Sequence, residues 1–84
     1  MKAKTIRINM DKGLDARPIA LLVQEASKYD SKIYVEQDGR RINAKSIMGM
    51  MTVVLNNGEE VTVTAEGEDE SVAIDSIEKF LCSN

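Results

Sequence analysis

The chain has 84 residues, a formal net charge of -3, no histidine and one cysteine. Such a length supports one small hydrophobic core, so we expect a single domain over residues 1–84 without a deep active site. No apolar run approaches the ~20 residues of a membrane span, and no signal-peptide core follows Met1, which favours a cytoplasmic protein. Dispersed basic residues without aromatic partners argue against direct nucleic-acid binding.

The N-terminal third predicts a strand and a helix. Apolar residues alternate with polar ones at Ile6, Ile8 and Met10, which is the period of a half-buried strand, and Gly13 interrupts the pattern. From residue 16 to about residue 27, apolar residues recur at helical spacing with polar residues between them. We therefore expect an amphipathic helix there.

The middle of the chain predicts a hairpin. Residues 32–36 alternate between apolar and polar side chains, and Asp38-Gly39 is a tight-turn dipeptide before a short return strand over 41–43. The run from 46 to 55 is apolar on nearly all sides, and its first half is expected to be a helix.

The C-terminal third predicts a strand followed by a helix. Residues 61–66 alternate again, and residues 73–81 carry an apolar helical stripe. The acidic cluster 68–70 suits the N-terminus of that helix. The resulting order, β-α-β-β-α-β-α, is packed most economically as four strands with the helices on one face of the sheet.

Two segments carry more specific patterns. Residues 13–18 read Gly-Leu-Asp-Ala-Arg-Pro, and residues 43–51 read Asn-Ala-Lys-Ser-Ile-Met-Gly-Met-Met. They resemble the phosphorylation loop, G-[IL]-H-A-R-P, and the regulatory serine site of HPr, the phosphocarrier of the bacterial sugar phosphotransferase system. The resemblance covers essentially the whole chain and is strongest to the catabolite-repression HPr homologues. It implies an α+β, HPr-like open-faced β-sandwich, in which three helices cover one face of a four-stranded antiparallel sheet.

Asp15 stands where the family has its phospho-acceptor histidine. The resemblance implies that this histidine accepts a phosphoryl group from Enzyme I, and a carboxylate cannot replace that step, so we expect neither a competent phosphocarrier nor an enzyme. Three interpretations of Asp15 stay open. It can cap the following helix, a contribution of ~1 kcal/mol; its charge beside Arg17 can mimic a phosphorylated loop; or it can form an acyl phosphate, which would need a cation that Asp11 alone holds weakly.

Ser46 precedes the apolar run, as an ordinary N-cap serine would. The resemblance implies that HPr kinase/phosphorylase phosphorylates it. A phosphate on an N-cap serine meets unsatisfied backbone amides and the positive end of a helix dipole, so modification is expected to act as a surface switch. Lys45 is adjacent in sequence, and the family places Arg17 near the same surface, so both are expected to support the phosphate.

The helix that follows Ser46 has almost no polar face. We assign Met50, and Ile47 in part, to the core. Met48 and Met51, with Ile47 and with Ala20 from the first helix, are expected to form an exposed docking patch, because thioethers adapt to more than one partner. The family uses this region for protein docking.

The resemblance therefore implies a regulator rather than an enzyme: a cytoplasmic protein that, once phosphorylated on Ser46, binds a LacI-type catabolite control transcription factor as its corepressor. No metal or cofactor is expected, and the lone Cys82 can form neither an internal disulfide nor a zinc site. Two alternatives are a divergent phosphocarrier and a phosphate-independent regulator of a metabolic enzyme.

Overall fold

The computed structural model describes residues 1–10, 16–53 and 55–82, with only the backbone described at residue 16. The elements are β1 (Lys2–Arg7), α1 (Ala16–Ala26), β2 (Lys32–Gln37), β3 (Arg40–Asn43), α2 (Ile47–Met50), β4 (Glu60–Glu66) and α3 (Glu70–Leu81). This order confirms the predicted β-α-β-β-α-β-α sequence of elements.

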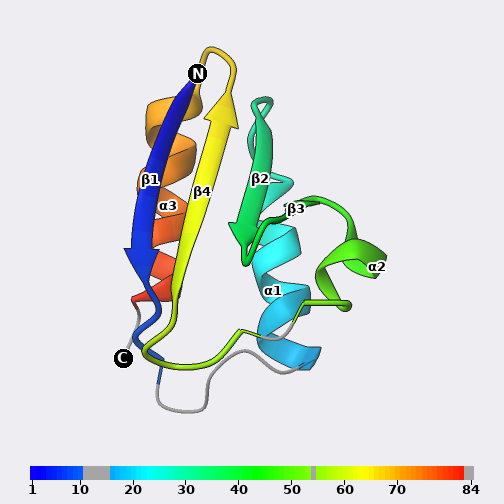
Figure 1. Ribbon diagram of the computed structural model, residues 1–84. Coiled ribbons are helices and arrows are strands. Elements are labelled where there is room, and N and C mark those ends of the chain that lie inside the picture. The colour runs from blue at the N-terminus through cyan, green and yellow to red at the C-terminus, as the bar shows by residue number, and fades with distance from the viewer. Residues whose placement is uncertain (11–15, 54, 83–84) are drawn as a thin grey trace.

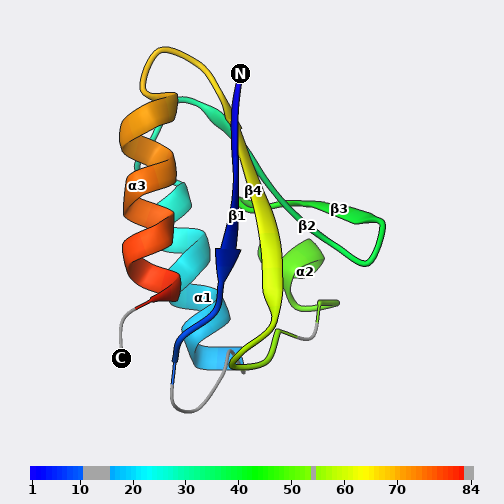
Figure 2. The ribbon, with the colours of Figure 1, turned by 60° about the vertical axis from the view of Figure 1, so that its left-hand side comes forward.

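The four strands form one antiparallel sheet in the order β1-β4-β2-β3, so β4 lies in the middle although it is last in sequence. Helices α1 and α3 lie side by side on the same face of the sheet (Figure 2). The short α2 packs near the β3 edge, where it contacts both α1 and β3 (Figure 1). The predicted α+β fold, a four-stranded antiparallel sheet with three helices, is confirmed.

Strand β1 ends earlier in the chain than the sequence predicts. Alternation pointed to Ile6, Ile8 and Met10, whereas β1 ends at Arg7. Ile8 is buried as expected, but its backbone leaves the ladder: its N–H donates to the Glu59 carbonyl (2.8 Å), and its carbonyl accepts from the Gly58 N–H (2.8 Å). The loop before β4 therefore takes over the pairing, and alternation alone cannot distinguish such a loop contact from a strand.

The β2–β3 turn agrees with its sequence. Asp38 and Gly39 have φ values of 52° and 79°, as a two-residue turn with left-handed central positions requires. Tyr34 pairs with Asn43 and Gln37 with Arg40 across the hairpin. The turn thereby fixes the register of β3, the strand that α2 contacts.

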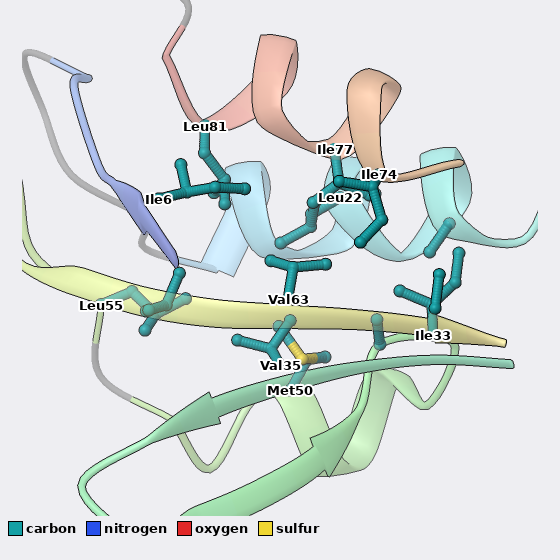
Figure 3. Packing of buried hydrophobic residues seen from close by; sticks show 14 of the residues in the cluster. Ile6, Leu22, Ile33, Val35, Met50, Leu55, Val63, Ile74, Ile77 and Leu81 are labelled. Carbon is teal, nitrogen blue, oxygen red and sulfur yellow. The ribbon is translucent and has the colours of Figure 1, made fainter. Parts of the chain in front are cut away.

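The core lies between the sheet and the helices (Figure 3). Leu22 of α1 and Ile74 and Ile77 of α3 face Val63 of the central strand, and all four are buried. Met50 of α2 is fully buried as well, on the side of Val35. The prediction that Met50 belongs to the core is confirmed, and its burial anchors α2 to the domain through one side chain.

A carboxylate joins the start of α3 to the loop after α1. Asp69 occupies the N-cap position of α3, yet its side chain does not cap that helix. Its oxygens accept hydrogen bonds from the N–H groups of Asp30 (2.9 Å) and Ser31 (3.0 Å) and from the Ser31 hydroxyl. These donors, the Ser31 hydroxyl above all, hold the pKa of the Asp69 carboxyl below its usual value.

We predict that acid weakens the fold through this carboxylate. Because its pKa is lower in the folded than in the unfolded protein, its stabilisation is complete above the unfolded pKa and is lost as pH falls below about 4 toward the folded pKa. Asp69→Asn should lower the urea midpoint at pH 7 and reduce the loss between pH 5 and pH 3. The exposed neighbour Glu68, changed to Gln, is the matched control. Identical pH profiles for the Asp69 variant and the parent would contradict the assignment.

Candidate functional site

Ser46 caps α2. Its backbone is extended (φ -98°, ψ 109°), and its Oγ accepts a hydrogen bond from the Gly49 N–H at 3.1 Å. Its own N–H donates to the Asn43 carbonyl (3.0 Å), so the residue is held on both sides. The predicted N-cap geometry is confirmed. Ser46 as a whole is half-buried.

The helix that Ser46 caps is a single turn. Four residues, Ile47–Met50, give it too few aligned peptides for a large macrodipole. The helix dipole that the sequence predicts at Ser46 is therefore small. The local backbone N–H groups at the start of the turn are the donors available to an anion at this position.

Lys45 anchors the segment before Ser46. Its Nζ donates to the carbonyl of Tyr29 at 2.5 Å, just beyond the end of α1, and its side chain is half-buried. Its N–H donates to Asn43 Oδ1 at 2.9 Å. Within the described residues the ammonium thus has a carbonyl as its hydrogen-bond partner. The expected role of Lys45 in supporting a phosphate on Ser46 stays a prediction.

We predict that this anchor stabilises the fold. Lys45→Met retains most of the aliphatic stem but leaves the Tyr29 carbonyl without its charged donor, which should cost about 1–2 kcal/mol of unfolding free energy. Lys32→Met, at an exposed position of β2, is the control and should change stability by less than about 0.5 kcal/mol. Urea melts of both variants give the answer; equal stability of the two would show that the contact contributes nothing.

Arg17 and Ala20 lie one turn apart near the start of α1. Arg17 is exposed, and among the residues that the structure describes it forms no ion pair. Ala20 is half-buried. Helix α1 contacts α2, the helix that Ser46 caps (Figure 1).

The apolar side chains of α2 divide between core and surface. Met48 is 81% exposed, Met51 46% and Ile47 42%, whereas Met50 is buried. Ile47 was assigned in part to the core, but it lies outside the core cluster and belongs with the two methionines. We call Ile47, Met48 and Met51, together with Ala20, the apolar patch.

Sequence reasoning missed one exposed apolar residue on α1. Leu21 is 46% exposed and directly follows Ala20. It lies off the helical stripe that predicted the buried face, since Leu22 takes the core position beside it. The sequence did contain a signal for this exposure, because Leu21 is a large apolar residue outside the buried helical stripe.

The Asp15 predictions concern a part of the chain outside the described residues. Asp11, Asp15 and the side chain at position 16 fall there, so the cap, phosphate-mimic and acyl-phosphate interpretations stay predictions. Across the described ranges, no three His, Cys, Asp or Glu side chains gather as a metal site would require. Nor does any helix in those ranges have the length and apolar character to cross a membrane.

An open four-stranded sheet with helices on one face, and a serine that caps a short turn beside exposed methionines, define a small α+β domain of the HPr type. A family model for the phosphotransferase-system HPr component phosphorylation site matches residues 2–83. The chain belongs to the HPr family. Its position 15, where it carries aspartate, departs from the histidine of the family motif.

Relatives named as phosphocarriers and as HPr-like proteins both match the chain. It is 42% identical over 81 residues to the HPr-like protein Crh of Halalkalibacterium halodurans, covering 96% of each chain. It is 47% identical over 80 residues to the phosphocarrier protein HPr of Treponema pallidum, covering 95% of this chain and 91% of that one. A crystal structure of HPr from Thermoanaerobacter tengcongensis superposes with a TM-score of 0.91 at 48% identity, covering 99% of this chain and 93% of that one.

Proposed function

We propose that this is a cytoplasmic regulatory protein of carbon catabolite repression, phosphorylated on Ser46 by HPr kinase/phosphorylase. The phosphorylated form would act as corepressor for a LacI-type catabolite control transcription factor, and the protein would not serve as a histidine phosphocarrier. The observation that carries the proposal is the placement of a half-buried, capping serine directly before the exposed side chains of Ile47, Met48 and Met51. The 40% identity to the solved structure of Crh, named there the catabolite repression HPr of Bacillus subtilis, supports the regulatory role.

A phosphate on Ser46 suits the local backbone. The Gly49 N–H already donates to the Ser46 oxygen, and a phosphate would offer it and its neighbours three strong acceptor oxygens. The turn would therefore keep its geometry upon modification. The new charge would lie beside Met48 and Met51 without unfolding the segment that holds them.

Charge and apolar area would act together at the interface. The two methionines supply adaptable contact area, whereas the phosphate supplies a charge that a basic partner recognises. Arg17, which has no ion pair among the described residues, could share the phosphate with the partner. A few central contacts supply most of the binding energy at protein interfaces. We therefore expect that loss of either the phosphate or the methionine contacts would prevent tight binding.

The phosphorylation half is tested by incubation with HPr kinase/phosphorylase and ATP. We expect one phosphate per chain, located at Ser46 by fragmentation mass spectrometry, and none on Ser46→Ala. The Ser46→Thr variant is the matched control for the folding of this segment, because it retains a hydroxyl that can cap α2. Phosphate on another residue, or no phosphate on a folded protein, would refute this half of the proposal.

A further inference from the structure

A small pocket lies between the β2–β3 hairpin and the segment that follows α2. Its volume is about 200 Å³. Apolar residues line it at Val35, Ile42 and Val53, and polar residues line it at Gln37, Asp38, Arg40 and Thr52. The pocket therefore combines an apolar lining with one cation and one anion.

The pocket is continuous with α2. Thr52 directly follows Met51 of the apolar patch, and its N–H and hydroxyl both donate to the Gly49 carbonyl, at 3.1 and 2.6 Å. On the other side, Ile42 is so close to α2 that a Cβ at Gly49 would lie 3.2 Å from its Cγ2. One wall of the pocket is thus fixed to the helix that carries the patch.

Arg40 spans the pocket from the hairpin to Thr52. Its Nη1 donates to the Thr52 carbonyl (3.4 Å) and its Nη2 to the Thr52 hydroxyl (3.2 Å). A guanidinium has five N–H donors, so three stay available, and Arg40 is exposed. The bonds to Thr52 hold this cation on the side of α2, whereas Asp38 lies in the hairpin turn. The remaining N–H donors of Arg40 suit a carboxylate of a partner.

The pocket's size decides what kind of occupant it suits. Sites for small-molecule ligands usually enclose roughly 300–1,000 Å³, and this pocket is smaller. A pocket that holds one buried anchor, flanked by a charge, is typical of the centre of a protein interface. Its continuity with the apolar patch points to the same macromolecular partner.

We propose that the partner which docks on the apolar patch inserts one large apolar side chain into this pocket and places a neighbouring Asp or Glu against Arg40. The docking surface would then extend beyond α2 to the hairpin. This inference rests on the proposed function, because it concerns the same partner.

Calorimetric titration of the Ser46-phosphorylated protein with the catabolite control transcription factor tests the inference. Arg40→Glu should weaken binding by at least about tenfold, because it sets like charges against each other. Asparagine tolerates the left-handed backbone of position 38, so Asp38→Asn should keep the turn while it removes the carboxylate opposite Arg40. The affinity should then be unchanged or higher. The opposite signs distinguish recognition of a carboxylate from general disturbance of the hairpin.

The methyl resonances of Ile42 and Val53 in the unmutated protein give a readout that no variant can disturb. They should shift on addition of the transcription factor. Unchanged methyl resonances, or full affinity of Arg40→Glu while Met48→Asp loses binding, would overturn the inference and leave the proposed function standing. Shifts that instead follow the concentration of this protein alone would assign the pocket to a second copy and overturn it too. If binding did not depend on Ser46 phosphorylation, the proposed function itself would be refuted.

Discussion

Met48→Asp is expected to weaken binding of the Ser46-phosphorylated protein to its transcription factor by at least about thirtyfold. Met48 is 81% exposed, so the substitution should leave the fold intact. It would place an anion beside the phosphate and desolvate a charge at the centre of the contact. Surface plasmon resonance with the phosphorylated variant measures the effect.

Val72→Asp is the matched control for this substitution. Val72 is an exposed apolar residue, 60% accessible, but it lies on α3 rather than on α2. We expect its affinity to equal that of the parent. If both variants bound like the parent, the apolar patch would have no part in docking.

Asp15→His is expected to produce the largest change in phosphoryl transfer. The parent has no histidine and should accept no phosphate from phosphoenolpyruvate through Enzyme I. The variant should gain an acid-labile phosphate, because Arg17 is exposed and Pro18 already lies in the first turn of α1. Labelled phosphoenolpyruvate with Enzyme I gives the readout.

Asp15→Asn is the control for that experiment, because it retains capping ability but offers no nucleophile. Label on the parent that is lost in this control would establish an acyl phosphate on Asp15. That result would favour the divergent phosphocarrier over the regulator.

The fold could be predicted because local patterns agreed with the packing. Alternation in residues 61–66 and the Asp38-Gly39 turn correspond directly to β4 and the hairpin. The first strand was misplaced because the backbone of Ile8 hydrogen-bonds with the loop before β4 rather than with a neighbouring strand. Periodicity indicates which side chains are buried. It does not indicate which other segment the backbone hydrogen-bonds with.

The local parts of the candidate site could also be predicted, and the long-range parts could not. The Ser46 cap and the exposure of Met48 depend on adjacent residues. The Lys45 contact joins residues 16 apart, and the contact between Asp69 and Ser31 joins residues 38 apart. The pocket is built from two segments that meet only in the folded chain. Such partners are set by tertiary packing, which no local pattern contains.

Calorimetric titration of the transcription factor with the phosphorylated protein, the unphosphorylated protein and Ser46→Ala tests the central claim most directly. We predict tight binding for the phosphorylated protein alone. Ser46→Asp should bind only weakly, because one carboxylate has less charge and fewer acceptor oxygens than a phosphate. Equal affinity of the phosphorylated and unphosphorylated proteins would contradict the account and would favour constitutive docking through the apolar patch.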